Sequence, residues 1–131
     1  MRFIGLVLVS LAFNTVYGQS KDLTESMKQG KMVYDDFCIT CHMGNGEGLL
    51  GTFPPLAKSD FLMKNRAKSI HAIKYGLQGE ITVSGTKYNG VMANLGLTDE
   101  EVADVMNYIT NSWGNKNDKL VTEKEVSEIK K

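Results

Sequence analysis

The sequence contains few residues that could cross-link or rigidify it, and it has no excess of either charge. Its 131 residues include two cysteines, two prolines and two histidines. Lysine and arginine together number 15, as do aspartate and glutamate, so the formal net charge is +0 at pH 7. Without a basic excess the chain has no global field that would attract nucleic acid or an anionic membrane. Any partner must therefore recognise a local surface.

Long hydrophobic runs are also lacking. The main apolar stretch covers residues 3–13, which is too short to span a bilayer comfortably. It follows Arg2 and precedes the small residue Gly18, the order of a secretory signal peptide. We therefore expect a cleaved signal peptide at residues 1–18, a mature domain at 19–131, and a periplasmic or otherwise exported protein without stable membrane insertion. An uncleaved anchor is the alternative.

With only two cysteines, the chain has no disulfide framework. Export would normally pair two cysteines as a disulfide. Here, however, they lie three residues apart, at Cys38 and Cys41. A bridge between them would close a very small loop and constrain little of the unfolded chain. A structural disulfide is therefore a poor explanation for the pair.

Apolar residues at helical spacing predict three main helices. The first covers residues 23–37 and is interrupted by Gly30. Because glycine costs about 1 kcal/mol relative to alanine inside a helix, we expect another backbone to approach closely there. The second covers residues 66–77. The third begins at Thr98, which forms a T-x-x-E capping box with Glu101, and its apolar stripe continues to Trp113.

The remaining segments are less regular. A Gly-rich stretch at residues 44–48 indicates a loop. A second T-x-x-E box at Thr122 predicts a short charged helix within residues 115–131, with so little apolar surface that we expect it to dock loosely. Residues 81–83 look extended, but no second strand is evident. The pattern indicates an all-α domain of about four short helices, whose few apolar stripes leave a core that something else must fill.

The chemistry lies in the segment Cys38-Ile39-Thr40-Cys41-His42. This is the C-x-x-C-H arrangement that attaches c-type haem. On one helical turn the two thiols share a face and can each add to one haem vinyl group, and the next residue, His42, can ligate the iron from the same side. A single covalently bound haem c would also supply the missing core.

Two other interpretations of these cysteines are possible. A structural zinc site needs four ligands, and Cys41 and His42 are adjacent and awkward to use together. A thioredoxin-like redox pair needs a βαβ context that the sequence does not show. The haem interpretation is therefore favoured over both.

Beyond this motif, the chain resembles a class I cytochrome c from Gly30 to Gly114. The matching segments are residues 30–34, the motif itself, residues 46–48, Phe53-Pro54-Pro55-Leu56, and Tyr88-Asn89-Gly90-Val91-Met92. The resemblance implies a cytochrome c fold with its helices wrapped around one haem.

The resemblance also implies a second iron ligand and a supporting contact. Met92 matches the family's axial methionine, with Met63 and Met43 as lesser candidates. Pro54 matches the proline whose carbonyl accepts a hydrogen bond from the ligating histidine, which would orient His42. His71 is expected to be a surface or core residue rather than a ligand.

One departure concerns the residues after the axial methionine. Ala93 and Asn94 follow Met92, where related proteins often have a proline. We therefore expect a less rigid ligand loop.

Residues 88–115 further resemble cytochrome modules of periplasmic oxidoreductases, such as quinoprotein dehydrogenases and copper nitrite reductases. The resemblance implies a non-enzymatic carrier that passes single electrons between periplasmic or membrane-associated redox proteins, whether dehydrogenase, reductase or oxidase. A five-coordinate haem sensor or a peroxidase-like enzyme is the alternative. A basic segment could steer an acidic partner, with cations at Lys58, Lys64, Arg66, Lys68 and Lys74.

Overall fold

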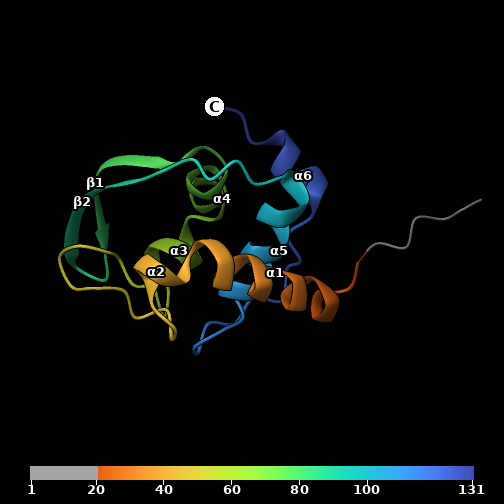
Figure 1. Cartoon of the computed structure of the whole chain (residues 1–131), viewed down its shortest axis with the longest axis horizontal. Coiled ribbons are helices and arrows are strands. Elements are labelled where there is room, and N and C mark those ends of the chain that lie inside the picture. The colour runs from red at the N-terminus through yellow and green to blue at the C-terminus, as the bar shows by residue number, and fades with distance from the viewer. Residues whose placement is uncertain (1–20) are drawn as a thin grey trace, which may run out of the picture.

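The computed structural model describes residues 21–131, so the predicted signal peptide at residues 1–18 lies outside the described residues. Helices form most of the molecule, and a small two-stranded sheet lies at one side of them (Figure 1). The elements in chain order are α1 (Leu23–Phe37), α2 (Ile39–His42), α3 (Asp60–Lys64), α4 (Arg66–Tyr75), β1 (Leu77–Val83), β2 (Thr86–Met92), α5 (Asp99–Ile109) and α6 (Glu123–Glu128). Over the described part of the chain, no helix is long and apolar enough to cross a membrane.

The crossing of α1 and α5 forms the centre of the fold. Both helices begin at side-chain caps: Asp22 accepts a hydrogen bond from Glu25 N, and Thr98 forms the full capping box with Glu101. At the crossing, a Cβ on Gly30 would lie 2.0 Å from the carbonyl oxygen of Asp104. The prediction of a close backbone approach at Gly30 is confirmed.

A polar network ties the same two helices to the C-terminal segment. The buried Asn107 amide donates to Ser26 Oγ and to the carbonyl of Val121, and accepts from Val121 N. Ser26 in turn donates to Asp104, which pairs with Lys21. Each buried polar group in this network has a partner, so its burial carries no large desolvation cost.

The all-α prediction is wrong for residues 77–92. The extended segment at 81–83 does have a partner: β1 and β2 pair antiparallel, from Leu77 opposite Met92 to Val83 opposite Thr86. Ser84 and Gly85 both adopt positive φ, as a tight hairpin turn requires. The partner strand is hard to recognise in the sequence because Asn89 and Gly90 interrupt its β-forming residues.

The α5 helix ends earlier than its apolar stripe predicts. It stops at Ile109 with Thr110 as its C-cap, four residues before Trp113. Trp113 has φ of 54°, so it lies outside the helix, and its ring packs 5.0 Å from that of Tyr34. The residue is partly buried against the core, but the turn rather than the helix places it there.

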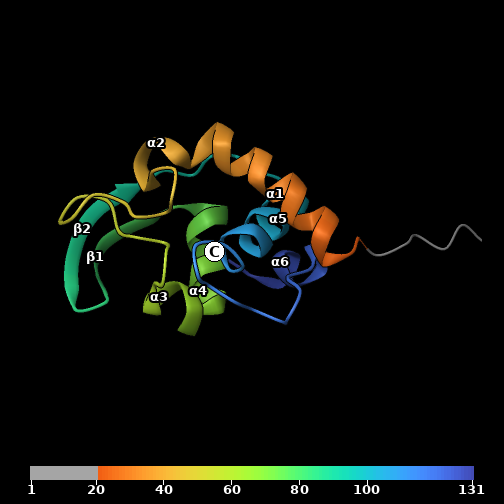
Figure 2. The same ribbon diagram turned by 90° about the horizontal axis from the view of Figure 1, so that it is seen from below.

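The predicted loose docking of residues 115–131 is wrong. The side chain of Val126 is fully buried, and Arg66 pairs with Glu125 while donating to the carbonyls of Lys119 and Leu120. Lys74 Nζ donates to the carbonyl of Val126. These contacts come mostly from polar groups of α4, which an apolar pattern does not reveal. Figure 2 shows α6 beside α5 at the end of the molecule remote from the hairpin.

Candidate functional site

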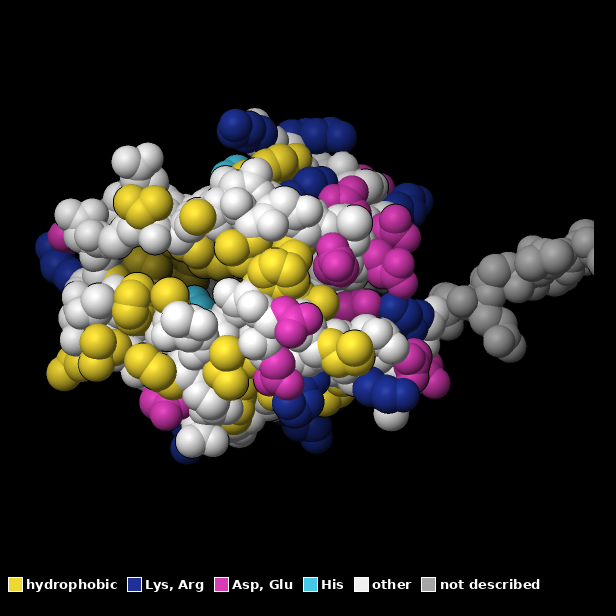
Figure 3. All heavy atoms as spheres, in the orientation of Figure 1, with side chains coloured by type: hydrophobic (Ala, Val, Ile, Leu, Met, Phe, Trp, Pro, Cys, Tyr) yellow, Lys and Arg dark blue, Asp and Glu magenta, His cyan; other side chains and the backbone are white. Residues whose placement is uncertain are grey.

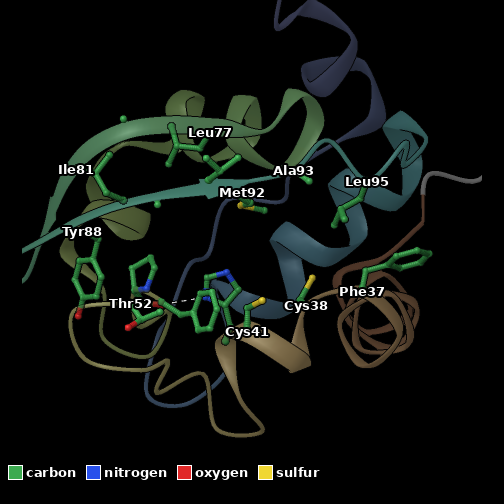
Figure 4. A pocket seen from close by; sticks show the side chains of 16 residues that line it. Phe37, Cys38, Cys41, Thr52, Leu77, Ile81, Tyr88, Met92, Ala93 and Leu95 are labelled. Atoms are coloured by element: carbon green, nitrogen blue, oxygen red, sulfur yellow. Dashed lines mark hydrogen bonds between the residues drawn. The ribbon is translucent and has the colours of Figure 1, made fainter.

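The chain turns sharply at the end of α1, and this turn brings the predicted thiols and imidazole together. Cys38 ends α1 and precedes α2, and its carbonyl accepts hydrogen bonds from Cys41 N and His42 N. The two thiols are free, and burial raises the pKa of the Cys38 thiol to about 11. Figure 4 shows both sulfur atoms at the edge of one cleft.

The imidazole of His42 is held by the loop that follows it. Its Nδ1 lies 2.9 Å from the carbonyl oxygen of Pro54, an acceptor, so Nδ1 carries the proton. This confirms the predicted contact with Pro54. Burial lowers the pKa of His42, and the bond to Pro54 offsets part of that effect. The neutral ring therefore has its other nitrogen, Nε2, available as an electron-pair donor to a metal.

Close packing shapes the loop between α2 and α3. A Cβ on Gly48 would lie 2.3 Å from the carbonyl oxygen of Phe53, and one on Gly46 would lie 2.5 Å from the Trp113 ring. Both glycines have φ of 63°. The sequence predicts a Gly-rich loop here but does not predict that Trp113 packs against it. An aromatic residue just beyond the last turn of α5 was the feature that could have indicated this contact.

A mainly apolar cleft lies between α2, the hairpin and α5. Its outer part has a volume of about 280 Å³, and a deeper space of about 70 Å³ continues toward α4 and α5. Both parts are bordered by the same six residues, namely Cys38, His42, Pro54, Leu77, Ile81 and Met92. The outer part opens to the surface, where Figure 3 shows a hollow among hydrophobic side chains.

Met92 reaches the cleft from the hairpin side, across from Cys41 (Figure 4). It is the last residue of β2, and the strand ladder holds it opposite Leu77. Gly76 allows the two chains to run close together, since a Cβ there would lie 2.7 Å from the carbonyl oxygen of Met92. The hairpin thus supplies a restraint on Met92 in place of the absent proline, which the sequence analysis did not foresee.

The other candidate ligands lie elsewhere. Neither Met43 nor Met63 borders the outer or the deeper part of the cleft, and Met63 packs against the hydrophobic core. His71 also lies outside the cleft lining, with its ring 5.1 Å from that of Tyr75.

These residues fit the requirements of a covalently held haem. Two thiols and a neutral imidazole lie on one wall, a thioether lies on the facing side, and the remaining walls are largely apolar. One buried hydroxyl that lines the deeper space, that of Ser69, has no hydrogen-bond partner within the described residues. Among those residues, no group of three His, Cys, Asp or Glu side chains could hold a metal ion.

Two of the five cations in the basic segment predicted to steer a partner are engaged in internal contacts. Arg66 binds Glu125, and Lys74 pairs with Asp99 and with the carbonyl of Val126. These two cations hold the C-terminal segment in place. A steering surface built on all five cations is therefore not present.

Comparison with known proteins gives a consistent set of relatives. The family model described as "Cytochrome c" matches residues 27–113. A cytochrome c-552 of Thermus thermophilus is 43% identical over 97 residues, which cover 70% of this chain and 65% of that protein.

A second Thermus thermophilus cytochrome c-552 is 48% identical over 82 residues, covering 59% of this chain and 63% of the relative. The cytochrome c subunit of a quinone alcohol dehydrogenase from Gluconacetobacter polyoxogenes is 30% identical over 105 residues, covering 77% of this chain and 22% of the subunit. The chain thus spans less than two thirds of the length of each of these relatives.

Proposed function

Because the chain belongs to the cytochrome c family, we propose that it is a mono-haem electron-transfer protein that passes single electrons between larger redox proteins. The family domain implies one covalently attached haem c. When bound, that group supplies an iron that alternates between the ferric and ferrous states. The observation that carries the proposal is the imidazole of His42, which is hydrogen-bonded to Pro54 and lines the same cleft as the two thiols and Met92.

Each residue of the site has a separate task. Cys38 and Cys41 would hold the haem through thioether bonds, and His42 would donate Nε2 to the iron while Nδ1 stays bound to Pro54. Met92 would donate its thioether sulfur to the iron as a second ligand, which would favour the ferrous state and raise the reduction potential. The apolar walls exclude water, so solvent reorganises little when the charge changes.

The chain's relatives suggest the type of partner. Two of them are named as cytochrome c subunits of quinone alcohol dehydrogenase and of gluconate 2-dehydrogenase. We therefore propose a dehydrogenase, reductase or oxidase as partner, in an exported electron-transfer chain as the signal peptide predicted at residues 1–18 indicates. A five-coordinate sensor or peroxidase is not favoured, because the relatives are named as cytochromes c and as cytochrome c subunits of dehydrogenases. Met92, which lines the cleft, would also be available as a second iron ligand.

Haem retention and redox cycling test this function. The haem should remain with the denatured protein through acid-acetone extraction and should titrate as a single one-electron couple. Wild-type ferrous protein should bind carbon monoxide poorly, because His42 and Met92 would both hold the iron. Loss of haem to the organic phase would overturn the covalent attachment, and fast stoichiometric binding of carbon monoxide would favour the sensor or enzyme.

Replacement of Met92 tests the second ligand. Met92→Ala should abolish the near-infrared sulfur-to-iron band of the oxidised protein, lower the midpoint potential and allow carbon monoxide to bind the reduced protein. Met43→Ala and Met63→Ala are the matched controls, because neither residue borders the cleft. If either control abolishes the band while Met92→Ala preserves it, the assignment of Met92 is wrong.

A further inference from the structure

The rim of the cleft carries exposed apolar side chains that no element of the described chain covers. We name as the docking face the exposed residues Phe37, Ile39, Leu49, Leu50 and Val91. Leu50 is 80% exposed and Val91 is 74% exposed, and the cleft beside them is itself largely apolar. Exposed apolar side chains grouped around a functional opening are typical of an interaction site.

The most exposed of these residues lies at the tip of a well-defined turn. Leu49 N donates to the carbonyl of Phe53 and Phe53 N donates back to the carbonyl of Leu49, which closes the turn around Leu50. Thr52 and Phe53 on the same turn line the cleft. Leu50 is therefore presented next to the opening on a backbone already ordered by hydrogen bonds, so that little entropy is lost when it enters a partner's pocket.

The same part of the surface is acidic, although the protein is neutral overall. Residues 32–57 and 88–101, which include most of the cleft lining, contain six carboxylates and no lysine or arginine. Residues 58–74 carry five lysine and arginine residues against one aspartate. Figure 3 shows both acidic and basic side chains on the side of the molecule that carries the hydrophobic hollow. The segments that supply most of the cleft lining are thus acidic, whereas residues 58–74 are basic.

Internal ion pairs leave part of this negative charge uncompensated. Asp35 pairs with Lys31, Asp99 with Lys74 and Glu100 with Lys21. Asp36 and Glu47 are exposed and form no ion pair within residues 21–131. Asp36 adjoins Phe37 in the chain, and Glu47 lies two residues before Leu49. Both carboxylates therefore belong to the segments that carry the docking face.

From this arrangement we propose that the docking face binds a redox protein whose own surface is basic around an apolar pocket, with Leu50 as the central anchor. The proposal rests on the proposed electron-transfer function and reverses the sign expected from the basic segment of the sequence. A second copy of this chain is a poor occupant, because two acidic faces repel each other. An anionic membrane is disfavoured for the same reason.

Small redox reagents of opposite charge report the sign of the electrostatic potential around the cleft. The reduced haem protein is oxidised in a stopped-flow instrument by cationic tris(phenanthroline)cobalt(III) or by anionic ferricyanide, at increasing ionic strength. The rate constant should fall with salt for the cation and rise for the anion, although the net charge is near zero. In the Asp36→Lys/Glu47→Lys variant, both trends should vanish or reverse, with a change of about tenfold at low salt for the cationic reagent.

A matched control outside the docking face is Lys64→Glu/Lys68→Glu, two exposed positions within the basic segment. This variant should retain both wild-type salt trends. If the control changes the trends and the Asp36→Lys/Glu47→Lys variant does not, the proposal fails and steering belongs to the basic segment. Reversible oxidation and reduction by both reagents supports the proposed function whatever the salt trends, so failures of the two proposals are distinguishable.

A peptide titration tests the apolar anchor without electron transfer. The probe is the amide of Lys-Lys-Trp-Lys-Lys, added to isotope-labelled haem protein and followed by amide chemical shifts. Shifts should concentrate on residues 36–39, 47–52 and 91, and Leu50→Ser should weaken binding several-fold without affecting folding, because Leu50 is so exposed. Shifts confined to residues 58–74, or a dimer in sedimentation that Leu50→Ser dissociates, would overturn the proposal.

Discussion

Gly30 determines how closely α1 and α5 approach each other. A side chain at this position would meet the backbone of Asp104 rather than a flexible group, so neither helix can yield without moving as a whole. The residue therefore acts through its lack of a Cβ atom. Glycine inside a helix costs free energy relative to alanine, but the closer packing of the two longest helices offsets this cost.

Substitution of Gly30 by alanine should destabilise the protein. Overpacking at the crossing should lower the free energy of unfolding by about 2 kcal/mol, even though alanine is the better helix former by about 1 kcal/mol. Denaturant unfolding followed by circular dichroism measures the change. Gly44→Ala is the control, because its Cβ would have nothing within 4 Å and should change stability by less than about 0.5 kcal/mol.

Among the elements, α6 shows how a short helix with little apolar surface can be held firmly. Arg66 on α4 donates to both carboxylate oxygens of Glu125 and to two backbone carbonyls. The Tyr75 hydroxyl donates to the carbonyl of Ile129. Val126 then supplies a fully buried apolar contact. The tail is fixed by one arginine and a few directed bonds rather than by a hydrophobic stripe.

Removal of the arginine should release this element. Arg66→Gln should lower the free energy of unfolding by about 1–3 kcal/mol, because Glu125 and two carbonyls lose a charged donor. Limited proteolysis should then cleave within residues 116–131 faster than in the wild type. Lys31→Gln, which breaks only an exposed pair with Asp35, should cost less than about 0.5 kcal/mol. Unchanged proteolysis of Arg66→Gln would contradict the role assigned to Arg66.

The same contact makes the docking of α6 dependent on acidity. The hydrogen bond from Arg66 holds the pKa of Glu125 below its ordinary value. The stabilisation is therefore fully present above the ordinary glutamate pKa of about 4.3 and is lost as the pH falls through the lowered folded-state pKa. Glu125→Gln should be less stable than the wild type at neutral pH and should lose less stability in that acidic range, as unfolding curves at several pH values would show.

For the molecule as a whole, the cleft replaces part of a normal hydrophobic core. Its outer space of about 280 Å³ opens to the surface and is lined mainly by apolar side chains. A bound apolar group would remove this lining from water, and the burial of apolar surface is favourable. Filling the cleft should therefore stabilise the fold.

Loss of both attachment residues should consequently unfold the protein. Cys38→Ala/Cys41→Ala, purified without haem, should show no cooperative thermal transition in calorimetry and little near-ultraviolet circular dichroism. The haem-loaded wild type should show both, and Leu50→Ser, which alters only the surface, should match it. A haem-free double variant with a sharp transition would show that the protein core is sufficient by itself.

Local patterns accounted for much of the fold and most of the site. The first helix has the predicted bounds, Thr98 forms its predicted capping box, and the thiols of Cys38 and Cys41 lie on one turn with His42. These features depend on residues within a few positions of each other. His42 and Pro54 are further apart along the chain, and their contact was predicted from the family resemblance.

The features that were missed depend on residues distant in the chain or on polar groups. The β2 partner of residues 81–83, the end of α5 at Ile109 and the anchoring of α6 by Arg66 all belong to this kind. An apolar pattern shows which residues are buried, but it does not show which donor reaches which acceptor.

The haem motif, the principal helices and the close approach at Gly30 follow from the sequence alone. The spacing of nearby residues and the missing side chain of glycine have the same effect whatever the tertiary packing. The folded arrangement was needed to show that a hairpin holds Met92 across from Cys41, and that Arg66 and Lys74 are engaged within the fold. It also placed the acidic segments around the cleft. Those outcomes depend on how distant segments pack, and packing determines which charges pair internally and which remain available at the surface.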